Sequence, residues 1–336
     1  MNWSIVYIES GVQTFLDPIV KSVRWSGDSK QASRKLVVEL SNTADMRSRL
    51  QLPEKGNELR LMMGEKKELF RGVIFADSID AEGQMSLTAY DENIYLTKNK
   101  DTKIFRNMKA SAVVKKLCSE FAVDTGEIKD TGFVIPKLVF RDKTLFEMMV
   151  MAITETRKQT GEQFYLTSRE GKLHLLPRKE QEVKWVLENG VNILGASYSQ
   201  SIEEMKTQIK VAGGDNKKKE MTASAKDAEL IRRFGTMQHV EKPDQSMTKS
   251  QMDQRAKQLL KEMGTIDDEA HIECLGIDDV VSGSAVYVKE SMTGILGGYY
   301  VSSDDHSFEG GTHKMSLTLS ATDELPKMEY KESKEA

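Results

Sequence analysis

The chain has 336 residues, of which 39% are hydrophobic and 30% charged, and its formal net charge is −4. This length predicts two or three domains, and the nearly balanced charge gives no reason to expect nucleic acid as the main partner. Two cysteines, Cys118 and Cys274, are too few for a disulfide scaffold and fit synthesis in a reducing compartment.

Residues 1–100 are predicted as β structure. The segment Met1–Glu9 has no basic region and only a short apolar run, which indicates a strand rather than a signal peptide. No apolar stretch approaches the roughly 20 residues that a membrane helix needs. Short alternating stretches follow, separated by turn signals such as Gly27–Asp28 and Pro53. This succession predicts a β-barrel or sandwich.

Residues 101–190 are predicted as an α/β insert. Apolar residues recur with helical spacing from Ala110 to Phe121, and Cys118 lies on that stripe as a buried thiol. Thr144 and Glu147 form a capping box that starts a second helix, and Gly161 ends it. A hairpin then follows at 164–177.

Residues 191–325 are predicted as a second β domain with one inserted helix at about 248–263. Strands are expected at 191–199, 205–212, 271–275 and 284–289, whereas 229–235 fits either a strand or a helix. The helix begins with a second capping-box pattern, Thr248–Gln251. Residues 326–336 are charged and are predicted as a loose tail.

Two segments share one layout. Gly298–Ala321 predicts a hairpin that turns at Gly310–Gly311, since paired glycines supply the positive φ of tight turns. Gly72–Glu92 has the same order of glycine, apolar strand, acidic break, glycine turn and alternating strand. Both second strands begin with Met-Ser-Leu-Thr. The fold class is therefore α+β, mainly β, with two related β domains.

Histidines give no clear metal site. His271 and Cys274 are three apart in a predicted strand, so their side chains point to opposite faces. His306 and His313 flank the terminal turn and could lie near each other, but no further ligands are evident. We expect no metal, cofactor or catalytic residue.

Acidic runs are the remaining catalytic candidates. They are Asp267–Glu269, Asp278–Asp279 and Asp304–Asp305, and any of them could supply a carboxylate for glycoside hydrolysis. Solvated turns explain such runs more simply. The basic run Lys217–Lys219 lacks the interleaved aromatic residues of a nucleic-acid surface.

The closing segment resembles a known family signature. Gly294–His306 followed by Gly311–Leu319 is similar to the C-terminal signature of phage tail hub proteins of the XkdQ/YqbQ family, found in phage-like tails and contractile bacteriocins. The order of Phe164–Leu176, Leu230–Gly235 and Ala256–Leu260 also fits, so the resemblance covers most of the chain. The signature positions are Gly298, Val301, His306, Gly311, His313, Met315, Leu317 and Leu319.

The resemblance implies a baseplate hub in the tail of a phage or phage-like particle. Such a subunit is a homotrimer with two tail-tube-like β-barrels, so that three chains present six tube-like domains. It joins the hexameric tail tube protein to the trimeric central spike, with baseplate wedge or LysM-type components as further neighbours. The resemblance implies neither nucleic-acid recognition nor membrane insertion.

Two alternatives remain open at this point. One is a peptidoglycan hydrolase of a tail tip that uses Asp304 or Asp305. The other is a sugar-binding module, although Trp3, Trp25 and Trp185 do not cluster in the sequence.

Overall fold

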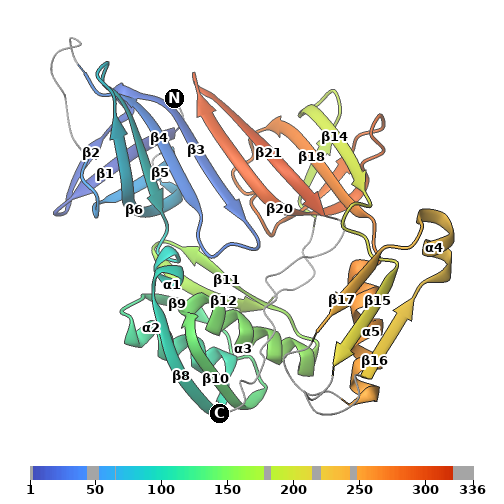
Figure 1. The fold of residues 1–336 in the computed structure, drawn as a ribbon. Coiled ribbons are helices and arrows are strands. Elements are labelled where there is room, and N and C mark those ends of the chain that lie inside the picture. The colour runs from blue at the N-terminus through green and yellow to red at the C-terminus, as the bar shows by residue number, and fades with distance from the viewer. Residues whose placement is uncertain are drawn as a thin grey trace. The chain divides into compact units, whose positions relative to one another are not determined.

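The computed structural model describes residues 3–43, 53–64, 66–177, 183–213, 221–242 and 248–320 (Figure 1). Strands dominate over helices, which confirms the α+β, mainly β class. The chain divides into two compact units, one of Met1–Ser197 with His271–Ala336 and the other of Tyr198–Ala270. The basic run at 217–219 and the tail at 326–336 lie outside the described residues.

No helix in the described part of the chain is long and apolar enough to cross a bilayer.

The N-terminal part of the larger unit is a sheet of seven strands in the order β3-β4-β7-β6-β5-β1-β2. They are β1 (Trp3–Glu9), β2 (Val12–Phe15), β3 (Val20–Asp28), β4 (Lys35–Ser41), β5 (Glu58–Met63), β6 (Lys67–Ile79) and β7 (Gln84–Tyr90), with a 3₁₀ turn at Asp17–Ile19. Alternate residues are buried, as in β4, where Leu36, Val38 and Leu40 face the core. Period-two patterning thus selects the buried face of each strand.

The same sheet continues into the C-terminal part of the chain. Its further strands are β13 (Trp185–Glu188), β14 (Ile193–Ser201), β18 (Asp267–Leu275), β19 (Ala285–Lys289), β20 (Leu296–Glu309) and β21 (Thr312–Ser320). Strand β3 is the link, because it pairs with β4 on one side and with β20 on the other (Figure 1). Phe308 of β20 accordingly packs in the core of the N-terminal strands.

Gly27 corrects one detail of the sequence prediction. It was expected in a turn, but it lies inside β3, and the connection to β4 begins after Asp28.

The two hairpins with the same layout have the same hydrogen-bonding register. In β6–β7, Ile74 faces Ala89 and the next pair is Ala76 with Thr88, so one residue of β6 bulges. In β20–β21, Val301 faces Leu319 and the next pair is Ser303 with Thr318, with a bulge at the matching residue. The repeat inferred from sequence therefore extends to a structural irregularity.

The match continues into the neighbouring strands. Leu59 of β5 faces Gly72 of β6, and Val286 of β19 faces Tyr299 of β20 at the corresponding step. On the other side, the Asn42 amide donates to the Gly83 carbonyl, and the Gly276 amide donates to the His313 carbonyl. We call β4-β7-β6-β5 the first repeat and β18-β21-β20-β19 the second repeat.

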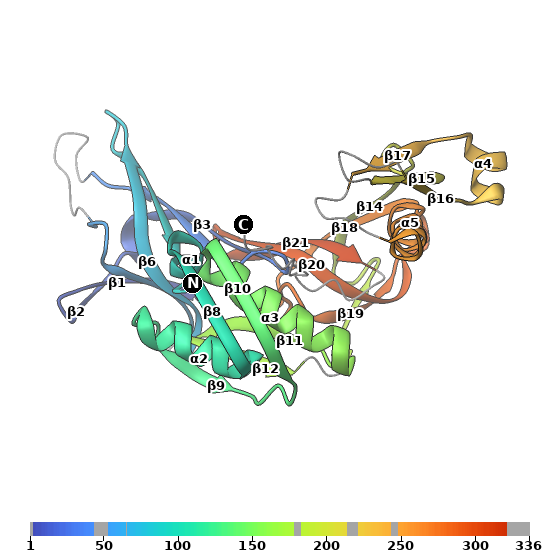
Figure 2. The same cartoon turned by 60° about the horizontal axis from the view of Figure 1, so that its bottom comes forward.

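An α/β region follows the first repeat. Its elements are α1 (Ile94–Lys98), β8 (Lys100–Lys109), α2 (Ala110–Glu120), β9 (Thr125–Ile128), β10 (Val134–Thr144), α3 (Leu145–Thr160), β11 (Phe164–Arg169) and β12 (Lys172–Pro177). Helices α2 and α3 pack on each other and on β8 and β10 (Figure 2). The capping box of Thr144 with Glu147 is confirmed, and Gly161 ends α3 in the left-handed conformation.

The smaller unit has a core of its own. It contains β15 (Gln208–Gly213), β16 (Met221–Lys226), α4 (Ala228–Phe234), β17 (Gln238–Glu241) and α5 (Lys249–Met263). Helix α5 lies along the sheet β16-β15-β17, and Ile209, Val211 and Met252 meet between them. Residues 229–234 of the ambiguous segment are helical, because Asp227 caps the amides of Glu229 and Leu230, and Gly235 ends the helix. The predicted inserted helix therefore comes with its own sheet.

Candidate functional site

The second hairpin holds most of the signature residues on its buried face. Val301, Met315, Leu317 and Leu319 are at most 3% exposed. Glu309 faces Thr312, so Gly310 and Gly311 form a two-residue turn, and their φ angles of 56° and 79° confirm why glycine is required there. Gly298 differs, since it lies exposed on β20 with ordinary backbone geometry.

His306 and His313 meet, as the sequence suggested, on the inner side of this hairpin. His306 Nδ1 lies 2.9 Å from His313 Nε2, and His306 Nε2 lies 2.9 Å from the Val280 carbonyl oxygen. A carbonyl can only accept, so His306 Nε2 carries the proton and His306 Nδ1 accepts from His313 Nε2. The pair is thus a short directed chain of hydrogen bonds ending on the backbone.

Burial keeps these two imidazoles neutral. Loss of hydration lowers the pKa of His306, and the same effect, with repulsion from His306, lowers the pKa of His313 to about 4. Aromatic contacts complete the surroundings: Phe308 stacks on His313 at 4.1 Å between ring centres, and Trp25 lies 4.9 Å from His306. The pair is built into a packed core.

Asp304 provides the charged part of the same cluster. Its side chain is fully buried and forms a bidentate ion pair with Arg34, whose Nη1 lies 2.9 Å from Oδ1. The Ser282 amide also donates to this carboxylate. The Arg34 guanidinium lies over the Trp25 ring, 4.3 Å from its centre. A buried charge pair with this many partners is fixed in a single geometry.

Arg34 also reaches the first repeat through its backbone. Its amide donates to Asp91 at 3.0 Å, and Asp91 follows the end of β7. Burial raises the pKa of Asp91 to about 7. One residue therefore ties the end of the first hairpin to the middle of the second. We call Trp25, Arg34, Asp304, His306 and His313 the junction cluster.

Two glycines make room for the junction cluster. A Cβ on Gly27 would lie 2.1 Å from Arg34 Nη1, and a Cβ on Gly276 would lie 2.1 Å from the His313 ring. Both distances are far inside van der Waals contact. A side chain at Gly276 would therefore displace the His313 ring, and one at Gly27 would displace the Arg34 guanidinium from its present position.

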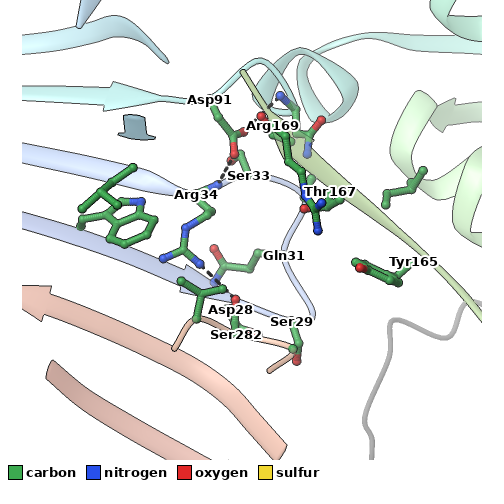
Figure 3. A pocket seen from close by; sticks show the side chains of 18 of the residues that line it. Asp28, Ser29, Gln31, Ser33, Arg34, Asp91, Tyr165, Thr167, Arg169 and Ser282 are labelled. Carbon is green, nitrogen blue, oxygen red and sulfur yellow. Dashed lines mark hydrogen bonds between the residues drawn. The ribbon is translucent and has the colours of Figure 1, made fainter. Parts of the chain in front are cut away.

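A cavity of about 350 Å³ opens beside Arg34 (Figure 3). Its wall comes from the β3–β4 connection, from α3, from Tyr165, Thr167 and Arg169 of β11, and from residues 278–283. The polar atoms Trp25 Nε1, Ser29 Oγ, Arg34 Nε and Asn93 Oδ1 in this wall are buried and have no hydrogen-bond partner among the described residues. The cavity thus lies where several separate segments of the larger unit meet beside Arg34.

The described wall of the cavity has few groups of the kind that an active site uses. No histidine or cysteine lines it. Its carboxylates are already engaged: Asp91 accepts from Arg34 and Asn93 amides, while Asp278 and Asp279 both bind Lys67. The hydroxyl of Ser168, which lines the cavity, donates to the Glu92 carboxylate, whose pKa is raised by burial.

The catalytic candidates from the sequence are separated by the strand geometry. Asp304 and Asp305 point to opposite faces of β20, the first to Arg34 and the second to Arg24, whose Nε lies 2.8 Å away. His271 and Cys274 alternate as expected, and Cys274 is fully buried. Burial also raises the thiol pKa of Cys118 and Cys274 to about 12. In the described part of the chain, no group of three or more potential ligands could hold a metal ion.

Sequence reasoning missed Trp25, Arg34 and Asp91. Asp304 did carry a local signal, because it occupies a position between Ser303 and Asp305 that the alternation of β20 assigns to the core. A buried aspartate needs hydrogen-bond donors or a cation, but the sequence does not say which residues supply them.

Comparison with solved structures defines the class of fold. The prophage MuSo2 43 kDa tail protein from Shewanella oneidensis superposes with a TM-score of 0.71 at 16% identity, covering 94% of this chain and 96% of that one. An Escherichia coli component of the type VI secretion system, reported as similar to the T4 bacteriophage tail proteins gp27 and gp5, gives 0.52 at 10% identity, covering 95% and 76%. The chain thus has a fold found in phage tail proteins.

The chain belongs to the YQBQ-like family, whose model matches residues 23–320. It is 34% identical over 314 residues to YqbQ and 33% identical over 314 residues to the phage-like element PBSX protein XkdQ, both of Bacillus subtilis. Each alignment covers 93% of this chain and 95% of the relative. The resemblance to the XkdQ/YqbQ family, inferred from the closing segment of the sequence, is confirmed.

Proposed function

We propose that this chain is a structural hub subunit of a phage-like tail baseplate. In this role three copies join the tube of the tail to its central spike. The observation that carries the proposal is the pair of repeats, which share strand order, register and one bulge. A trimer of chains with two similar repeats offers six similar faces to a hexameric tube and three identical ones to a spike.

Family membership and fold support the setting. XkdQ is named as a protein of a phage-like element, and the MuSo2 protein is named as a tail protein. The two repeats are proposed to be the tube-like domains, near residues 1–100 and 191–325, with 101–190 as an insert outside the ring. In this proposal the signature residues hold the strands of the second repeat in place, chiefly through the hydrogen bond between His306 and His313.

The junction cluster supports a mechanical role. Arg34 and β3 connect the repeats by a buried ion pair and by a strand ladder, so the two would keep a constant relative orientation. An adaptor needs such constancy, because each repeat must match an identical tube subunit.

No observation favours a hydrolase. Asp304 is held by Arg34 in the core, and Asp305 is ion-paired with Arg24 on the other face. We expect the purified full-length chain to leave no cleared band in a peptidoglycan zymogram. Clearing that Asp305→Asn abolishes would contradict the structural role.

Labelling tests the location directly. A peptide tag at the C-terminus, marked with an antibody fragment, is expected at the tube–spike junction in images of isolated tails. The same label at the outer rim of the baseplate or along the tube would overturn the proposal.

A further inference from the structure

The cavity beside Arg34 has the size of a small-molecule site. Its volume of about 350 Å³ lies in the range of sites for small organic ligands and far exceeds the space of a single water molecule. It lies within the larger unit, and Figure 3 shows Arg34 on one side of the space and Tyr165 of β11 on the other. The proposed hub function assigns this cavity no role.

Part of the cavity wall is apolar. Phe146, Val150 and Ile153 are four and three residues apart, so they share one face of α3. Phe164 and Leu166 of β11 line the same cavity. Water gains few hydrogen bonds against such a surface, whereas an apolar ligand group removes the surface from water. This part of the wall favours a ligand with an apolar or aromatic body.

Another part of the wall carries buried polar atoms that have no hydrogen-bond partner among the described residues. Trp25 Nε1 and Arg34 Nε can only donate, Asn93 Oδ1 can only accept, and Ser29 Oγ can do both. Arg34 uses its two terminal nitrogens in other hydrogen bonds, so Nε is the one that is left. Buried polar groups are normally paired, and these atoms therefore favour a ligand with both an acceptor and a donor.

The connection that holds Ser29 and Arg34 can adjust its side chains to a ligand. It spans residues 29–34 and contains no helix or strand. The unpaired side-chain atoms lie just behind the cavity surface, so a ligand meets them after small side-chain rotations. The backbone stays in place, because the Ser29 amide donates to the Ser302 carbonyl and the Arg34 amide donates to Asp91.

The charges of the wall favour a neutral ligand. Arg34 is a partly buried cation, and Asp304 already neutralises it. Arg169 also lines the wall, but its side chain is exposed and hydrated. A ligand carboxylate would share the cavity with the carboxyl groups of Glu68 and Asp91. A ligand ammonium group would offer no acceptor to the indole and guanidinium N–H groups, and a charge buried without partners is costly.

We propose that this cavity is a binding site for a small neutral molecule that carries an amide or a similar polar group on an apolar or aromatic body. The amide oxygen accepts from Trp25 and Arg34, and the amide N–H donates to Asn93 or Ser29. The apolar body lies against α3 and β11. One chain supplies the whole wall, so the site does not depend on hub assembly.

Titration of the isolated full-length chain with N-acetyl-phenylalanine amide tests the site. This probe is neutral and combines amide groups with one aromatic ring. The chain is labelled with nitrogen-15 at its three tryptophans, so that each indole N–H gives one signal. Trp3 is the matched control, because its Nε1 is also buried without a partner among the described residues but lies outside the cavity wall.

We expect the Trp25 signal to shift to saturation with a dissociation constant of about 1 mM or tighter, while the Trp3 signal stays constant. N-acetyl-phenylalanine and phenylalanine amide carry the same ring with a negative or a positive charge, and each should bind about tenfold more weakly. A Trp25 signal that does not move up to about 10 mM probe overturns the site and leaves the hub proposal intact. Equal affinity for a charged probe overturns the neutral class of ligand.

Variants of the wall show where the probe binds. Ala32→Phe fills the cavity from the β3–β4 connection and is expected to abolish the Trp25 shift, whereas Ala81→Phe in the exposed β6–β7 turn leaves it unchanged. Ser29→Ala removes one hydrogen-bonding group and should weaken binding about threefold, with Ser26→Ala outside the wall as its control. Unchanged affinity in both Ala32→Phe and Ser29→Ala overturns the site.

Discussion

Arg34 and Arg24 form neighbouring ion pairs that differ in burial. The Arg34 side chain is 20% exposed and its partner Asp304 is fully buried, whereas the Arg24 side chain is 69% exposed and its partner Asp305 30%. Coulomb attraction is similar at contact, but removing a partner is costly only where the remaining charge cannot be hydrated. A buried and an exposed ion pair can therefore be compared within the same protein.

Arg34→Met is expected to lower the free energy of unfolding by about 3–5 kcal/mol, because Asp304 is left buried without its cation. Arg24→Met should cost about 1 kcal/mol or less. Urea unfolding of the full-length variants measures both. Equal losses would contradict the account of the junction cluster.

The histidine pair predicts a pH effect with a definite sign. The pKa of His313 is lowered to about 4 in the folded chain. The unfolded chain therefore binds more protons between pH 4 and 6.5, and the contribution of His313 to stability falls as the pH falls through that window. The pKa of Asp91 is raised to about 7, so its contribution to stability increases as the pH falls. The stability of the wild type alone therefore does not reveal the contribution of His313.

The difference in unfolding free energy between wild type and His313→Gln isolates the contribution of His313. From pH 7 to pH 5, wild type should lose about 2 kcal/mol relative to this variant, which no longer titrates there. Urea midpoints at the two pH values give the number, with His239→Gln as the control histidine. A constant difference across the window would exclude this protonation linkage.

At the scale of elements, the sequence predicted the features that depend on residues close together in the chain. The capping boxes at Thr144 and Thr248 and the Gly310–Gly311 turn were predictable, because each involves residues a few positions apart. The β3–β20 ladder was not, since its strands are about 280 residues apart and neither carries a partner-specific pattern. Gly27 was misjudged for the same reason: it lies inside the strand, where the Arg34 guanidinium packs over it.

The glycines of the junction give a prediction about elements. Gly276→Ala should cost about 1–3 kcal/mol, because the new methyl group overlaps the His313 ring. Gly298→Ala is expected to change stability by less than about 0.5 kcal/mol, since no neighbouring atom lies within 4 Å of its Cβ position. Thermal unfolding of the two variants shows which one loses more stability. A larger loss for Gly298→Ala would mean that the second repeat packs differently.

At the scale of the whole molecule, the smaller unit is an insertion with its own core. Ile209, Val211, Ala223, Met252, Ala256 and Leu259 form that core within residues 198–270. A domain with its own hydrophobic core can in principle fold alone.

Replacing residues 203–264 by a short Gly-Ser linker is therefore expected to leave the larger unit folded, with a melting temperature within about 5 °C of the full chain. Circular dichroism and hydrogen exchange on β20 and β21 measure this. Loss of cooperative unfolding would show that the larger unit depends on the insertion.

The central claim is that the two repeats act as equivalent parts of a hub ring. A reconstruction of the tail tip without imposed symmetry tests it most directly. The account predicts three copies of this chain, with first and second repeats alternating around the ring and each facing one subunit of the tube. A ring of six copies, or repeats that face different neighbours, would contradict it.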